Sequence, residues 1–164
     1  MNGVVRVARS YRVDAWRVYD AWLDPAVAGR WLFATATRPM TDVSIDPRVD
    51  GTFRLARRDE GGDGGYVGKY LSLVPARRIA FALAPREGMG PTLVRIEIAT
   101  QDAGCRLALS HEQVPAASVR ELKARWTGIL YGLGATLESL RYATAAASAA
   151  TERISQGGAQ CITC

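Results

Sequence analysis

The sequence has few of the residues that bind metals or cross-link small secreted folds. Among 164 residues there are three cysteines and a single histidine, His111. Three cysteines are too few for a disulfide scaffold. The Cys161-x-x-Cys164 pair supplies only half of a structural zinc site, and the other candidate ligands, Cys105 and His111, are distant in the sequence. We therefore expect no metal and no other cofactor, and we expect the cysteine pair to lie in a solvated tail.

Long apolar runs are also missing. No run approaches the ~20 residues that a membrane-spanning helix needs. Residues 1–13 alternate arginine with apolar residues, unlike the hydrophobic region of a signal peptide. With 48% hydrophobic and 23% charged residues, the composition is typical of one folded domain and not of a disordered chain. These features predict a soluble, cytoplasmic protein without membrane insertion.

Lysine is scarce, so arginine carries most of the positive charge. Lys69 and Lys123 are the only lysines, and the formal net charge is +5. The arginines are spread along the chain one or two at a time, and no predicted helix carries a basic stripe. No predicted strand combines aromatic and basic residues as an RNA-binding platform does. The sequence therefore predicts no dedicated nucleic-acid site.

Hydrophobic periodicity in the first two thirds of the chain predicts strands. Residues 5–13 alternate as a half-buried strand, and Asp14 is suited to cap a short helix that the Asp24-Pro25 step ends. A second short helix follows, close to Trp31. Alternating apolar residues separated by turn signals then predict further strands, for a total of about seven. Their short connections favour antiparallel pairing.

From Pro115 the period of the apolar residues changes to that of a helix. Apolar residues recur at three- and four-residue spacing as far as Leu140, which predicts a helix roughly 40 Å long. Residues 143–164 are rich in alanine, serine and glycine, which predicts a frayed helix end and a disordered tail. The predicted domain is therefore residues 1–142. Its expected class is α+β, with a curved antiparallel sheet that grips a carboxy-terminal helix.

Several short motifs occur along the predicted domain. Residues 9–11 (RSY) and 18–25 (VYDAWLDP) resemble the pattern R-x-[FY]…V-[FW]-x-A-[WL]-x-D-P, and Trp31 resembles a tryptophan that follows the two short helices of that pattern. Residues 46–54 (DPRVDGTFR) resemble D-x-R-x-G-G-x-F-R, with Asp50 in place of the first glycine.

The later motifs follow in the same order. Residues 68–70 (GKY) with 75–79 (PARRI) resemble G-x-[YF]…P-x-x-[KR]-[IL], and residues 107–111 (LALSH) with Trp126 resemble the closing strand and helix of the same pattern. Together these motifs resemble START-like, helix-grip proteins. The chain is similar to the heat-shock-protein-90 ATPase activator homologue-like branch of the START/polyketide-cyclase (SRPBCC) superfamily, over roughly residues 4–141.

The resemblance implies a fold more firmly than a function. It implies a cavity for a hydrophobic small molecule between sheet and helix, a cyclase-type activity, or contact with a chaperone and a link to the stress response. Eukaryotic activators carry a separate chaperone-binding domain with an N-x-W-H-W-E-E-type motif. This sequence lacks the motif, so a chaperone partner is disfavoured.

The polar candidates for a binding site are few. His111 shares the inward parity of Leu107 and Leu109, so it is either a general acid or base or a strand-end histidine bonded to backbone. Arg9 also faces inward and needs an ion pair, an exposed position or a ligand anion. Glu97 is the first acid to test as its partner, but its parity points outward, so the partner of Arg9 stays open. The residues predicted to surround the cavity are Arg9, Trp22, Trp31, Phe53, Tyr70, Phe81, His111, Trp126 and Leu130.

Three functions stay open on this sequence. A carrier or sensor of a hydrophobic or amphipathic molecule is favoured, because no Ser-His-Asp order, carboxylate pair, phosphate loop or metal cluster is recognisable. The alternatives are a polyketide cyclase or dehydratase that uses His111 or Tyr70 for proton transfer, and a protein-interaction module such as a chaperone ATPase activator. For any single aromatic residue, ordinary core packing is the simpler interpretation. The oligomeric state is also open, a homodimer included.

Overall fold

The computed structural model describes residues 2–35, 37–58, 65–85 and 90–157. Within these ranges one antiparallel sheet has seven strands in the order β1-β7-β6-β5-β4-β3-β2. The strands are β1 (Asn2–Tyr11), β2 (Asp42–Ile45), β3 (Thr52–Ala56), β4 (Tyr66–Val74), β5 (Arg78–Leu83), β6 (Thr92–Gln101) and β7 (Gly104–Pro115). The helices are α1 (Ala15–Leu23), α2 (Pro25–Trp31), the short 3₁₀ helix η1 (Ala116–Ser118) and α3 (Val119–Gly157).

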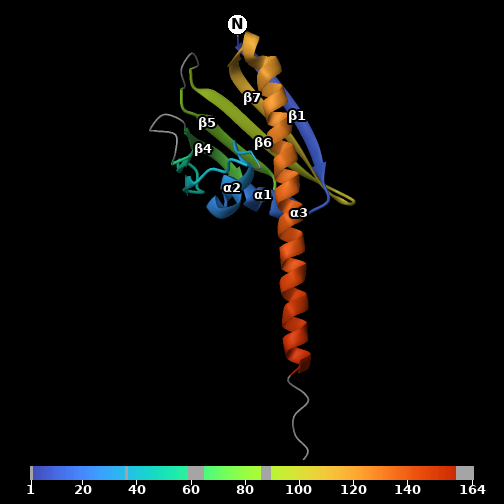
Figure 1. The fold of residues 1–164 in the computed structure, drawn as a ribbon. Coiled ribbons are helices and arrows are strands. Elements are labelled where there is room, and N and C mark those ends of the chain that lie inside the picture. The colour runs from blue at the N-terminus through green and yellow to red at the C-terminus, as the bar shows by residue number, and fades with distance from the viewer. Residues whose placement is uncertain (1, 36, 59–64, 86–89, 158–164) are drawn as a thin grey trace, which may run out of the picture.

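The arrangement confirms the predicted helix-grip fold. Strands β2 to β7 follow one another as a meander, and β1 joins the sheet beside the last strand, β7. Helices α1 and α2 come directly after β1, and α3 lies across the sheet (Figure 1). The Asp24 side chain caps α2 by accepting a hydrogen bond from the Ala26 amide at 2.9 Å, and Pro25 occupies the first turn, where no amide hydrogen is needed.

The turn between β2 and β3 explains one departure from the motif pattern. Asp50 has a φ of 66°, in the left-handed region that favours glycine. Aspartate is among the few other residues that tolerate this region. The Asp50 amide also donates to the Tyr70 carbonyl at 2.9 Å, which ties the turn to β4. Asp50 therefore replaces the glycine of the pattern without changing the course of the chain.

Helix α3 has two parts with different surroundings. In the first part an apolar face with helical spacing is buried against the rest of the domain, through Trp126, Ile129, Leu130, Leu133 and Leu137. At Gly134 the helix approaches β1 closely, since a Cβ there would lie 3.4 Å from the Tyr11 ring. Among the described residues, none of the helices combines the length and the hydrophobicity that a membrane span requires.

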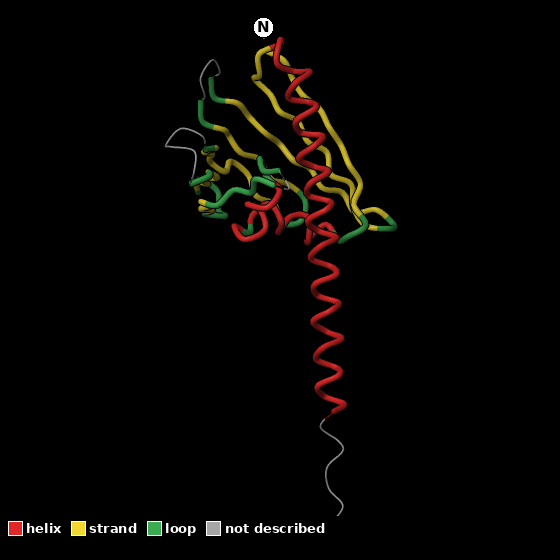
Figure 2. Tube along the Cα trace, in the orientation of Figure 1, coloured by secondary structure: helices red, strands yellow, loops and turns green. Residues whose placement is uncertain are grey.

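The second part of α3 extends beyond the strands, as Figure 2 shows. The helix has 39 residues and is about 58 Å long. It continues through residues 143–157, where the composition predicted a frayed end and a tail, because alanine has the highest helix propensity even without a partner surface. Tyr142 and Ile154 are exposed there. Residues 158–164, with the predicted solvated Cys161 and Cys164, lie outside the described residues.

Candidate functional site

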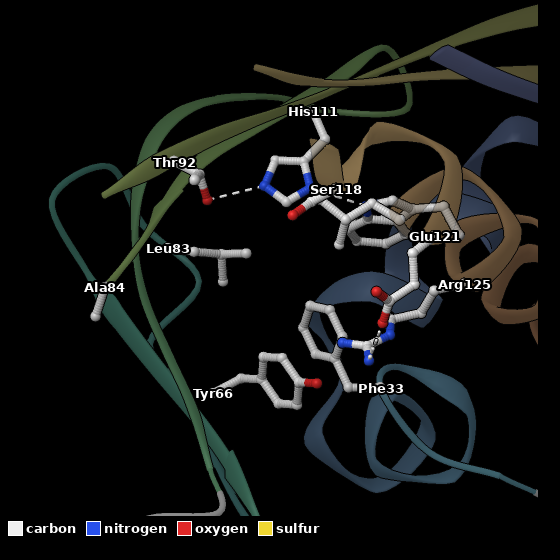
Figure 3. A pocket seen from close by; sticks show the side chains of 11 residues that line it. Phe33, Tyr66, Leu83, Ala84, Thr92, His111, Ser118, Glu121 and Arg125 are labelled. Carbon is white, nitrogen blue, oxygen red and sulfur yellow. Dashed lines mark hydrogen bonds and ion pairs between the residues drawn. The ribbon is translucent and has the colours of Figure 1, made fainter. Parts of the chain in front are cut away.

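A cavity of about 260 Å³ lies between the start of α3 and one end of the sheet. The antiparallel register brings the end of β5, the start of β6 and His111 of β7 to the same place, since Leu83 pairs with Thr92 and Val94 pairs with His111. Helix η1 and the first turns of α3 close the other side (Figure 3). The lining residues are Phe33, Tyr66, Leu83, Ala84, Thr92, His111, Ser118, Glu121, Leu122, Arg125 and Trp126.

A chain of buried hydrogen bonds forms one wall of the cavity. The Trp126 indole Nε1 donates to His111 Nδ1 at 3.0 Å, and His111 Nε2 lies 2.8 Å from Thr92 Oγ1 (Figure 3). His111 and Thr92 are 3% and 2% exposed. An indole N–H can only donate, so Nδ1 must be the acceptor. The hydrogen of the neutral imidazole is therefore on Nε2, and Nε2 donates to the Thr92 hydroxyl oxygen.

This arrangement keeps His111 neutral. Burial lowers the pKa of His111 from 6.5 to about 4, because the cavity wall offers little solvation to an imidazolium. A second proton would have to enter at Nδ1, where the Trp126 indole hydrogen already points. Both ring nitrogens are occupied, so the geometry gives no support to His111 as a general acid or base.

Aromatic rings form the opposite wall. The Phe33 and Tyr66 rings are stacked, with centroids 3.9 Å apart and planes at 8°, and the Phe33 ring lies 5.5 Å from that of Trp126. Phe33 has a φ of 56°, a conformation that costs a residue other than glycine about 1–2 kcal/mol. Strained backbone of this kind is concentrated at binding and catalytic sites. The chain that follows α2 thus holds an apolar ring against the cavity.

The cavity opens to solvent beside the first turns of α3. Glu121 and Arg125 lie one turn apart there, with Arg125 Nη2 3.6 Å from Glu121 Oε1. Their side chains are 78% and 50% exposed. An exposed pair of this kind contributes little to stability. The Arg125 guanidinium can therefore exchange its partner at low cost, and this charged pair makes the rim of the cavity polar.

Of the residues predicted from the sequence, His111 and Trp126 line this cavity. Five of the others fill the core beside it and contact one another, as T-shaped or tilted ring pairs with centroids 4.6–6.5 Å apart: Trp22, Trp31, Phe53, Tyr70 and Phe81. The void that Trp22, Phe53, Tyr70 and Phe81 border is only about 10 Å³, too small for a ligand. Burial raises the pKa of the Tyr70 hydroxyl, the other predicted proton donor, and Tyr70 does not reach the cavity. Leu130 is buried, and its carbonyl accepts from the Tyr11 hydroxyl at 2.8 Å.

Arg9 lies in a different place, between β1 and α3. It borders a separate groove of about 520 Å³, and its guanidinium carbon lies 5.1 Å from the centre of the Tyr131 ring. Glu97, the first acid to test as its partner, pairs instead with Arg78, its direct cross-strand neighbour, which donates to it at 2.7 Å. Among the residues that the structure describes, no carboxylate lies within ion-pair distance of Arg9.

Sequence reasoning missed most of the cavity lining. Thr92 has the inward parity of Val94 and Ile96 on the same strand, so the alternation that placed the strand could have identified it. Phe33 and Ser118 lie outside the regular strands and long helix, and no periodicity marks them. Among the described residues, no three histidine, cysteine or acidic side chains are placed to hold a metal ion.

The fold and the cavity define a helix-grip domain with a small internal pocket. The chain belongs to the family described as Activator of Hsp90 ATPase homolog 1-like protein, whose model matches residues 12–138. This family is part of the SRPBCC superfamily. Among curated proteins, none matches the chain.

Solved structures with the same fold come from several bacteria. The AHSA1-like protein from Aeromonas hydrophila is 20% identical with a TM-score of 0.72, over 84% of this chain and 94% of that one. Protein CV1439 from Chromobacterium violaceum is 27% identical with a TM-score of 0.69, over 82% and 96%. CalU16 from Micromonospora echinospora is 21% identical with a TM-score of 0.64, over 86% and 88%.

Proposed function

We propose that the protein binds a small, mainly apolar molecule in the cavity between the start of α3 and the sheet. The observation that carries the proposal is an open space of about 260 Å³ with two almost completely buried polar side chains, His111 and Thr92, on its wall. A mainly apolar space with a few fixed polar groups on its wall is typical of a small-molecule binding pocket, where the polar groups orient the ligand. Membership of the SRPBCC superfamily supports the same function.

The size of the cavity limits the ligand. Binding pockets for drug-sized molecules are roughly 300–1,000 Å³, so a compound with one or two rings is the upper limit here. Burial of about 200 Å² of apolar ligand surface would contribute a gross ~5 kcal/mol before the cost of association. Affinity for such a ligand is therefore modest unless polar contacts add to it, and assays need ligand in the micromolar to millimolar range.

Native mass spectrometry of gently purified protein, beside a denatured control, tests the proposal. Ser118 lines the cavity from η1, and its neighbour Ala117 is exposed and does not line it. Ser118→Phe would fill the space, and Ala117→Phe adds the same ring outside it. We expect a reproducible extra mass on the parent protein and on the Ala117→Phe variant, and its loss from the Ser118→Phe variant. An extra mass that persists in Ser118→Phe would place the ligand elsewhere.

A further inference from the structure

The hydrogen-bond chain on the cavity wall leaves one donor unused. The Thr92 hydroxyl oxygen accepts from His111 Nε2, so its own hydrogen needs a second acceptor. Among the residues that the structure describes, the Thr92 hydroxyl has no second hydrogen-bond partner. The side chain is 2% exposed and lines the cavity. Buried donors are almost always paired in folded proteins, so a partner for this hydrogen is expected inside the cavity.

The direction of the chain is fixed by its first member. The Trp126 indole cannot accept a hydrogen bond, so each later group must accept from the one before it and donate to the one after it. Reversal would require a proton on Nδ1, opposite the indole N–H. The Thr92 hydroxyl is thus a fixed donor at the end of a chain that runs from α3 through β7 to β6.

We infer that the ligand carries a neutral carbonyl oxygen, as in a ketone, aldehyde or ester, and that this oxygen accepts a hydrogen bond from the Thr92 hydroxyl. The inference rests on the proposed binding function and narrows its ligand class. The rest of the ligand would lie against the stacked Phe33 and Tyr66 rings on the opposite wall.

The groups around Thr92 disfavour a charged ligand group at this position, whether anionic or cationic. His111 is neutral. Among the described residues, Arg125 is the only cationic side chain that lines the cavity, and it lies at the solvent-exposed rim. A carboxylate at Thr92 would lose its hydration without a cation to replace it. An ammonium group has no lone pair to accept from the hydroxyl. A neutral carbonyl oxygen has a lone pair to accept from the hydroxyl and carries no net charge that would lose its hydration.

Two probes of nearly the same shape test the inference. Acetophenone has the carbonyl oxygen, and α-methylstyrene has a CH₂ group in its place. Each is titrated into the parent protein, Thr92→Val and Thr92→Ser, and binding is followed by the NMR signal of the Trp126 indole N–H. Valine keeps the shape of threonine without the hydroxyl, and serine keeps the hydroxyl. Comparing each probe across the variants cancels the different hydration of the two probes, and unfolding midpoints show that each variant is folded.

We expect Thr92→Val to weaken acetophenone binding roughly threefold to tenfold and to leave α-methylstyrene binding unchanged. Thr92→Ser should bind acetophenone as the parent does. Equal effects of Thr92→Val on both probes, or no effect on either, would overturn the carbonyl assignment while the cavity remains a binding site. If neither probe binds the parent protein at millimolar concentration, the proposed binding function fails, and the inference fails with it.

Discussion

The single histidine makes the stability of this protein depend on pH in a calculable way. His111 is held neutral in the folded chain, with a pKa lowered by burial from 6.5 to about 4. In the unfolded chain it regains the ordinary value. Between these two values the unfolded chain binds more protons than the folded chain, so the free energy of unfolding falls as the pH falls. The contribution of His111 is complete above pH 6.5 and stops changing below about pH 4.

The size of the effect follows from the two pKa values. Each tenfold difference in proton affinity corresponds to about 1.4 kcal/mol. The free energy of unfolding should therefore fall by about 2 kcal/mol between about pH 7.5 and about pH 5, and by about 3 kcal/mol in total below about pH 4. The parent protein has no other histidine, so this part of the pH dependence belongs to one side chain.

Urea unfolding followed by tryptophan fluorescence measures the effect, with His111→Gln as the matched control. A glutamine amide can accept from Trp126 and donate to Thr92, but it does not titrate. The difference in unfolding free energy between parent and His111→Gln should change by about 2 kcal/mol between about pH 7.5 and about pH 5. Parallel pH profiles for the two proteins would refute the assignment of His111 as a buried neutral imidazole.

Three further predictions follow from the packing. Gly68→Ala places a Cβ against an aromatic ring and a backbone carbonyl, so it should lower the free energy of unfolding by about 1–3 kcal/mol. Gly128→Ala meets open space on a helix, so it should raise the free energy of unfolding by about 0.5–1 kcal/mol. Equal urea midpoints for the two variants would contradict this packing. Trp126→Phe removes the donor to Nδ1, so an NMR titration should give His111 a higher pKa than in the parent, and an unchanged pKa would show that the indole hydrogen bond plays no part. Deletion of residues 143–164 should leave the thermal unfolding midpoint unchanged, because the described part of this segment is almost entirely exposed; a large decrease would make it part of the domain.

The fold could be predicted from the sequence because its signals are local. Alternation marked the strands, the Asp24-Pro25 step separated the two short helices, and the leucine spacing marked α3. The extent of α3 was underestimated, since the alanine-rich end has no apolar face that would reveal a helix. Its propensity alone continues the helix to Gly157.

The cavity could be predicted only in part, because its position depends on which aromatic side chains fill the interior. His111 and Trp126 were found through inward parity and helical spacing. The same reasoning selected Trp22 and Phe81, which pack against each other and leave no room for a ligand. Sequence patterns show that a side chain faces inward and not whether a neighbour already occupies the space. Phe33 also depends on a left-handed backbone conformation that no sequence pattern marks.

The most direct test of the binding function is a titration of the parent protein with acetophenone, observed on the indole N–H signals in an NMR spectrum of ¹⁵N-labelled protein. The four tryptophans provide their own controls, since Trp126 lines the cavity, Trp16 is 58% exposed on α1, and Trp22 and Trp31 lie in the core. We predict that the Trp126 signal shifts and saturates while the Trp16 signal stays in place. A shift of Trp16 with Trp126 unmoved would show that the ligand binds on the surface, and it would contradict the cavity as the functional site.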